Sequence, residues 1–271
     1  MQQRRLADLT VSAIGLGAMP LSVQGRPDEP QAMRTVHAAL DAGVTLIDTA
    51  DAYSVGHDDV GHNERLVAKA LATKGGHTRP PDGSWALDGS PQHLRAACEA
   101  SLQALGVEAI GLYQYHRPDP GVPYAESLGA LEELRQEGKV RLVGISNADV
   151  DQIELALATT QLAAVQNEFS PAFRSSRPEL ELCARHGIAF LPWSPLGGAA
   201  RAAGLGREHA AFAEVAAERG VSPQQVALAW ELAQADVVIP IPGASRSASI
   251  LDSVAACDLE LTVDELVRLA A

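Results

Sequence analysis

The feature that most limits the possible folds of this chain is a regular alternation of short apolar runs with longer amphipathic segments. The apolar runs predict eight strands, at residues 13–16, 45–47, 70–73, 110–115, 140–145, 163–166, 189–192 and 237–239. The segments between them predict helices near residues 29–42, 63–71, 90–105, 124–137, 149–159, 178–186, 208–219 joined with 222–234, and 246–254. Strands that alternate with helices form parallel sheets with right-handed crossovers. Eight such units predict an α/β fold of the closed (β/α)8 type, a TIM barrel.

Residues with helix-capping chemistry stand at the predicted helix ends. Ser90 and Ser222 are each followed by a proline, which suits the first helical position. Capping boxes are predicted for the pairs Ser222 and Gln225, Asp149 and Gln152, and Thr262 and Glu265. Left-handed glycine caps are predicted at Gly106, Gly138, Gly187 and Gly220. The stretch "GGAARAAGLG" is expected to be a loop.

The length of 271 residues fits one barrel domain spanning residues 1–271, with residues 4–12 as a short N-terminal hairpin over the barrel bottom. The rival architecture is a doubly wound dinucleotide-binding sheet, suggested by "GLGAMP" after the first predicted strand. That fingerprint needs a third glycine where this chain has Pro20. The barrel is therefore preferred.

Composition excludes several classes of function. A formal net charge of -13 argues against a nucleic-acid or anionic-membrane partner. No apolar run approaches the ~18 residues of a membrane span, and no signal peptide is recognisable, so a cytoplasmic protein is expected. Cys98, Cys183 and Cys257 lack disulfide or zinc spacing. Because no helix shows an unpaired apolar face, a monomer is favoured.

The acidic segment "GHDDVGHNE", residues 56–64, resembles a metal cluster only superficially. Its spacing matches neither zinc nor calcium sites, so no metal is predicted. It is interpreted as a solvated loop that ends with Asn63 as a helix N-cap and Glu64 in the first turn.

Reactive side chains follow three consecutive predicted strands. Asp48 and Tyr53 come after the second, Lys74 after the third and His116 after the fourth. Because chemistry in such barrels sits at the carboxyl ends of the strands, we expect the four to converge on one rim. Taken singly, each has a simpler interpretation as a turn, packing, surface or loop residue.

Together these four groups are suited to proton transfer at a carbonyl or an alcohol. A free tyrosine titrates near ~10, and a neighbouring lysine ammonium is expected to lower the pKa of Tyr53. A carboxylate keeps that lysine charged, and His116 is placed to bond the substrate oxygen. Asp51 is expected only to shape the turn that carries Tyr53.

Six motifs in order, "LIDTADAY", "ATKGG", "LYQYHRPDP", "VGISN", "WSPLGG" and "IPGASR", resemble those of the aldo-keto reductases. The resemblance runs from about residue 12 to residue 255. It implies NADPH-dependent reduction of an aldehyde or ketone, reversibly, with Tyr53 as general acid or base and hydride from C4 of the nicotinamide. The implied catalytic tetrad is Asp48, Tyr53, Lys74 and His116.

The resemblance also implies where the cofactor binds. The implied cofactor-binding residues are Ser146, Asn147 and Gln166 for the carboxamide, Trp193 for ring stacking, Ser194, Leu196, Gly197 and Gly198 for the pyrophosphate, and Ser245 and Arg246 for the 2′-phosphate. An arginine at that position favours NADPH over NADH. Asp252 and Ser253 depart from the Glu and Asn that many members carry near the adenine. Only ten residues separate Gly198 from His209, which predicts a less firmly clamped cofactor.

Loops after the strands supply three candidate residues for the substrate pocket, Met19, Trp85 and Arg117. Trp85 either caps an apolar substrate or packs under its own loop. Two other functions stay open at this point: an NADPH-binding regulatory or redox-sensing subunit with negligible turnover, and a cofactor-free barrel isomerase or lyase. The identity of the small-molecule carbonyl or alcohol is not encoded in these motifs.

Overall fold

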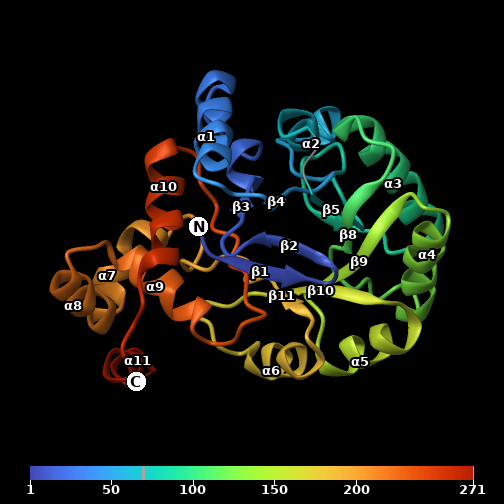
Figure 1. Cartoon of the computed structure of the whole chain (residues 1–271). Coiled ribbons are helices and arrows are strands. Elements are labelled where there is room, and N and C mark those ends of the chain that lie inside the picture. The colour runs from blue at the N-terminus through green and yellow to red at the C-terminus, as the bar shows by residue number, and fades with distance from the viewer. Residues whose placement is uncertain (69–70, 271) are drawn as a thin grey trace.

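The computed structural model describes residues 1–68 and 71–270 and shows a curled parallel sheet surrounded by helices (Figure 1). The sheet has seven strands in the order β11-β10-β9-β8-β5-β4-β3. Their bounds are β3 (Leu16–Gly17), β4 (Ile47–Asp48), β5 (Ala72–Gly75), β8 (Ile110–Tyr115), β9 (Val140–Ser146), β10 (Leu162–Gln166) and β11 (Ala189–Phe190). The predicted strand at 110–115 matches β8, whereas the others shift by one to three residues. The start of the predicted strand 70–73 lies outside the described residues.

The eighth strand position is filled by residues 237–243, which form no regular strand. Val238 and Gly243 make isolated parallel bridges to Phe190 and Gly17, on the two edges of the sheet. Pro240 and Pro242 accept hydrogen bonds at their carbonyls but have no N–H to donate, so a continuous ladder cannot form. The predicted strand at 237–239 is therefore wrong as a strand, although the segment does close the barrel.

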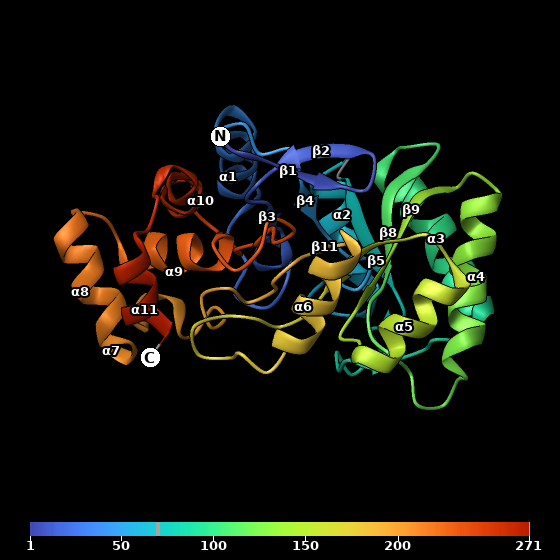
Figure 2. The same ribbon diagram turned by 60° about the horizontal axis from the view of Figure 1, so that its bottom comes forward.

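Helices form the outer ring. They are α1 (Glu29–Asp41), α2 (His62–Leu66), α3 (Pro91–Leu105), α4 (Tyr124–Gln136), α5 (Val150–Thr159), α6 (Arg177–His186), α7 (Leu205–Glu208), α8 (Ala210–Arg219), α9 (Pro223–Leu232), α10 (Ser247–Ala255) and α11 (Val263–Ala270). Figure 2 shows α7 to α11 gathered at one side of the barrel. The two joined helices predicted at 208–219 and 222–234 are α8 and α9, and Gly220, with φ 67°, ends α8 as predicted. The predicted "GGAARAAGLG" loop holds a 3-10 turn, Ala202–Gly204, and the start of α7.

Most predicted caps are present. Ser90 and Ser222 accept hydrogen bonds from backbone amides at the starts of α3 and α9. The boxes at Asp149 and Thr262 are complete. Half of the third box is missing: Gln225 N donates to Ser222 Oγ, but the Gln225 side chain is turned to Asp252, to which its Nε2 donates, and does not accept from the Ser222 N–H. The four predicted glycine caps all have positive φ.

Two antiparallel hairpins lie outside the barrel sheet. The first, β1 (Gln3–Leu6) with β2 (Leu9–Ser12), crosses the barrel opening in Figure 1, as predicted. It inserts Leu6 and Val11 into the apolar cluster of the barrel interior. The second, β6 (His77–Thr78) with β7 (Ala86–Leu87), lies in the loop between β5 and β8 and was not predicted. Among the described residues, no helix is long and apolar enough to cross a membrane.

Candidate active site

A polar layer lies directly above the apolar filling of the barrel. Side chains alternate along a strand, so a residue two positions after an inward-facing one also faces inward. The apolar layer includes Leu46, Ala72, Leu112 and Ala164. Two residues further along each strand stand Asp48, Lys74, Gln114 and Gln166, all buried. The strand period thus delivers a charge pair and two amides to the carboxyl end of the barrel.

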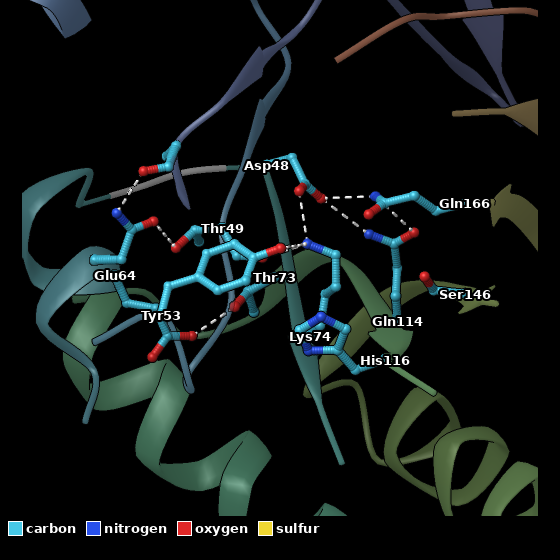
Figure 3. A network of polar contacts seen from close by, with 12 residues as sticks. Asp48, Thr49, Tyr53, Glu64, Thr73, Lys74, Gln114, His116, Ser146 and Gln166 are labelled. Carbon is cyan, nitrogen blue, oxygen red and sulfur yellow. Dashed lines mark hydrogen bonds and ion pairs between the residues drawn. The ribbon is translucent and has the colours of Figure 1, made fainter. Parts of the chain in front are cut away.

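Lys74 is the centre of this layer (Figure 3). Its fully buried ammonium donates to Asp48 Oδ2 at 2.6 Å, to the Thr49 carbonyl at 2.9 Å and to Tyr53 Oη at 3.1 Å. All three ammonium protons therefore have acceptors. Because Tyr53 Oη accepts from Lys74, the phenolic proton is left for a partner in the cavity that Tyr53 lines.

Asp48 is held on its other side by two amides. Its Oδ1 accepts from Gln166 Nε2 at 2.9 Å and from Gln114 Nε2 at 3.2 Å. Sequence reasoning missed Gln114, although its place two residues before His116 and two after the inward-facing Leu112 marks it as inward. The two oxygens of Asp48 thus accept three hydrogen bonds from surrounding side chains.

His116 and Tyr53 lie side by side at the cavity floor. Their ring centroids are 5.7 Å apart, edge to face, and both residues line the cavity. The buried Nδ1 of His116 has no hydrogen-bond partner among the described residues. Two groups able to bond one oxygen atom therefore face the same space, and the predicted tetrad is brought together.

Burial controls the protonation of these groups. It holds the pKa of Tyr53 above its ordinary value, and the Lys74 ammonium offsets this only in part. The predicted lowering of the Tyr53 pKa is therefore outweighed by the closely packed surroundings. Burial opposes the charge of Lys74, but Asp48 and Tyr53 outweigh it and raise the Lys74 pKa. Burial and Lys74 hold the pKa of His116 well below its usual value.

The cavity above this layer has a volume of about 390 Å³. Its lining includes these predicted site residues: Met19, Asp48, Tyr53, Trp85, His116, Arg117, Ser146, Asn147, Gln166, Trp193, Ser194, Leu196 and Gly198. Lys74 lies beneath the floor. All three predicted substrate-pocket residues are on the wall, and Trp85, 44% exposed, packs edge to face on His77. His77 also lines the cavity and was missed by sequence reasoning.

The backbone near the end of β11 is unusual over residues 194–198. Ser194, Gly197 and Gly198 have φ of 51°, 79° and 85°. A turn that includes residues of positive φ can point several backbone N–H groups toward one side, which is an arrangement suited to anions; the Gly197 N–H is already bonded to the Ser194 carbonyl. Asn147 likewise has φ 58°, and its amide already donates to the His116 carbonyl and to Ser146 Oγ.

Four predicted cofactor residues lie outside the cavity lining: Gly197, Ser245, Arg246 and Asp252. Ser245 and the exposed Arg246 precede α10, with Arg246 at its N-cap. Asp252 lies within α10, where its carboxylate accepts from Ser222 Oγ at 2.7 Å and Gln225 Nε2 at 2.6 Å. Both carboxylate oxygens of Asp252 are thus engaged in tying α10 to the start of α9.

The acidic segment at 56–64 is only partly a solvated loop. Gly61, not Asn63, is the N-cap of α2. Asn63 and Glu64 are buried, and Asn63 Nδ2 donates to the Ala18 carbonyl at 2.8 Å while Glu64 accepts from Thr73. The predicted cap is wrong because these polar groups find tertiary partners. No cluster of potential metal ligands occurs among the described residues.

The fold and the site define a class: an α/β barrel whose cavity ends on a buried lysine–carboxylate pair and a phenol. Comparison with known proteins makes the class specific. The aldo/keto reductase family model matches residues 13–271. An uncharacterized oxidoreductase of Schizosaccharomyces pombe is 33% identical over 277 residues, covering 98% of this chain and 88% of the yeast protein. The chain belongs to the aldo/keto reductase family and is an oxidoreductase.

Solved structures agree with this assignment. A glycerol dehydrogenase from Gluconobacter oxydans superposes with a TM-score of 0.85 at 27% identity, covering 99% of this chain and 94% of that one. An aldo/keto reductase from Klebsiella pneumoniae, in complex with NADP and acetate, gives a TM-score of 0.79 at 28% identity, with 96% and 90% covered. Both likenesses extend over nearly the whole barrel.

Proposed function

We propose that this protein is an NADP(H)-dependent carbonyl reductase in which Tyr53 exchanges a proton with the substrate oxygen. The observation that carries the proposal is the hydrogen bond from Lys74 Nζ to Tyr53 Oη, which leaves the phenolic proton facing the cavity. His116 on the same floor is kept neutral and provides a second contact for that oxygen. Family membership and the NADP complex of the Klebsiella pneumoniae relative support the choice of cofactor.

The residues present fit such a cofactor. Trp193 Nε1 is buried without a partner among the described residues, and the flat indole lies on the cavity wall, suited to stacking. Gln166 uses its Nε2 on Asp48 and keeps a carbonyl oxygen for an amide donor. The turn at 194–198 offers backbone N–H groups to a pyrophosphate. When bound, the nicotinamide would supply the hydride.

Within this proposal the chain's own groups divide the work. Lys74 and Asp48 hold the phenol in place, and the Lys74 charge stabilises the phenolate left after proton donation. In the reverse direction that phenolate accepts the proton from an alcohol. Acid–base assistance of this kind contributes about 100- to 10,000-fold to rate.

The test is NADPH consumption, followed by its absorbance with a panel of aldehydes and ketones, for the wild type and Tyr53→Phe. We expect Tyr53→Phe to lower kcat by roughly 100-fold or more, while NADPH still quenches Trp193 fluorescence with an unchanged Kd. Asp51→Asn is the matched control. Burial and Glu64 hold the pKa of Asp51 well above its usual value, so an amide replaces a carboxyl that is readily protonated. NADPH binding without turnover of any carbonyl would instead support a regulatory subunit.

Preference for NADPH over NADH is proposed to reside at Arg246. Its side chain forms no ion pair with any described residue, and it stands at the positive end of α10. Arg246→Ser is expected to raise the KM for NADPH about 10-fold or more and to leave that for NADH nearly unchanged. Equal effects on both cofactors would place the 2′-phosphate elsewhere.

A further inference from the structure

The substrate side of the cavity carries a positive charge without a matching carboxylate. Arg117 follows His116 directly, lines the cavity and is exposed. Its one hydrogen bond runs from Nη2 to Asn147 Oδ1 at 3.0 Å, and it forms no ion pair with any described residue. The remaining guanidinium donors have no partner among the described residues. Asp48 is the carboxylate of the described lining, and it is fully occupied by Lys74 and two amides.

A second arginine lies behind Trp85, a residue of the cavity lining. Arg79 is 8% exposed and stacks its guanidinium 4.2 Å from the ring centroid of Trp85, which lines the cavity. It donates through Nη2 to the Val55 carbonyl, whereas its buried Nε and Nη1 have no partner within the described ranges. A buried guanidinium without a carboxylate is costly, and contact with one aromatic face offsets only part of that cost.

Both charges lie next to the cavity lining, Arg117 as part of it and Arg79 against the ring of Trp85. Met19, His77 and Trp85 belong to the same lining, and His77 contacts Trp85 and His116 edge to face. Burial lowers the pKa of His77, and Arg117 lowers it further, so the imidazole does not add a competing charge at neutral pH. Burial raises the pKa of Glu168 and the charge of Arg117 opposes that rise, but the two residues form no ion pair.

We propose that Arg117, with Arg79 behind Trp85, forms an anion site that determines specificity, so that the protein prefers carbonyl substrates bearing a carboxylate or phosphate over neutral ones. This proposal rests on the proposed reductase function. The planar fork of an arginine matches either anion through paired hydrogen bonds. The substrate would place its carbonyl oxygen between Tyr53 and His116 and its anionic group toward Arg117.

An alternative role for Arg117 is to hold Asn147 in place for the cofactor. The two roles predict different kinetics. A positioning role slows all substrates alike and weakens NADPH binding. An anion site affects charged substrates alone. Arg117→Gln keeps an amide donor for Asn147 and removes only the charge, so it separates the two.

The experiment compares kcat/KM at saturating NADPH for the ortho, meta and para isomers of carboxybenzaldehyde with their neutral methyl esters. A second arm compares para-formylphenyl phosphate with para-methoxybenzaldehyde to distinguish a phosphate from a carboxylate site. The variants are Arg117→Gln, Arg117→Lys and, as a control, Arg141→Met. Arg141 pairs with Asp8 of the N-terminal hairpin, so its loss removes the same charge away from the cavity.

We expect the wild type to favour at least one acid over its ester by about 10- to 100-fold. Arg117→Gln should abolish that preference and spare the esters, Arg117→Lys should keep part of it, and Arg141→Met should behave as wild type. Equal kcat/KM for every acid–ester and phosphate–ether pair in the wild type overturns the proposal. So does an equal loss for acids and esters in Arg117→Gln.

A binding measurement separates this proposal from the reductase function. Isophthalate and its dimethyl ester, which hold no reducible aldehyde, are titrated against the NADP⁺-loaded protein with tryptophan fluorescence as the signal. Tighter binding of the diacid, lost in Arg117→Gln, supports the anion site even if no aldehyde consumes NADPH. Equal rates of aldehyde reduction for the acid and ester substrates, with no preference in binding, support the reductase function and refute the anion site.

Discussion

Replacement of Asp48 by asparagine should show how strongly the buried lysine depends on its carboxylate. The Asp48 Oδ2 to Lys74 Nζ distance is 2.6 Å, and the lysine side chain has no solvent exposure. Asparagine keeps the shape and an acceptor oxygen but leaves the ammonium without a counter-charge. Removing one partner of a buried ion pair costs about 3 to 5 kcal/mol. For a chain of this size that corresponds to a fall in Tm of roughly 10 °C.

The sign of the pH dependence should also change. In the wild type the Lys74 pKa is raised, so its contribution to stability is present at neutral pH and is lost only as pH rises through that raised value. Without Asp48, burial becomes the dominant influence and the Lys74 pKa falls below its ordinary value. The unfolded chain then binds the proton more tightly than the native one, so stability increases with pH until about 10.4.

The assay is urea unfolding at several pH values together with kcat for reduction. Asp48→Asn should be destabilised and slow, whereas the double variant Asp48→Asn/Lys74→Met should recover much of the stability and stay inactive, because no buried charge is left unpaired. A single variant within about 1 kcal/mol of the wild type would refute the reasoning. The reasoning would also be refuted if the stability of Asp48→Asn decreased with pH below about 10.4.

Two further predictions follow from burial. Because burial holds the Tyr53 pKa above ~10, kcat/KM for reduction should stay level across neutral pH and fall only in strong alkali, while that for alcohol oxidation should rise with pH; parallel profiles would contradict this. Glu231 is fully buried, and both its carboxylate oxygens lack partners among the described residues. Burial raises the pKa of Glu231 well above the usual value. Above pH ~4.3 the unfolded chain therefore loses this proton more readily than the native one, and the free energy of unfolding decreases as pH rises. Glu231→Gln should raise Tm at pH 8 and flatten its pH dependence in thermal unfolding, whereas the exposed control Glu154→Gln should not.

Strand-borne features could be predicted from the sequence because they depend on local periodicity. The apolar run at 110–115 coincides with β8. The candidate site was predicted from the residues at the predicted strand ends, Asp48, Lys74 and His116. Residues 237–243 were predicted as a strand but are not one, because their prolines interrupt the hydrogen-bond ladder. Their backbone nevertheless bridges both edges of the sheet and closes the barrel. The apolar pattern reports burial, but it does not report hydrogen bonding.

Polar residues with distant partners could not be placed from sequence. Asn63 looked like a cap, yet its amide reaches the Ala18 carbonyl 45 residues earlier. Gln225 looked like half of a capping box, yet it bonds Asp252. Capping chemistry and tertiary bonding use the same side chains, so only the folded arrangement decides between them. The direction of the Tyr53 pKa was missed for the same reason, because burial is a property of the whole cavity.

In the proposed reaction, proton delivery depends on residues of the strands, whereas the choice of substrate depends on residues of the segments that follow them. Lys74 and Asp48 lie in strands of the closed barrel, so their geometry is fixed by the sheet and by the two amides beside them. Arg117 and Trp85 lie in segments that follow strands, where sequence changes disturb few backbone pairings. Proton delivery should therefore tolerate exchange of these segments, whereas the choice of carbonyl compound should not. Specificity can then change while the pH dependence of the chemical step stays the same.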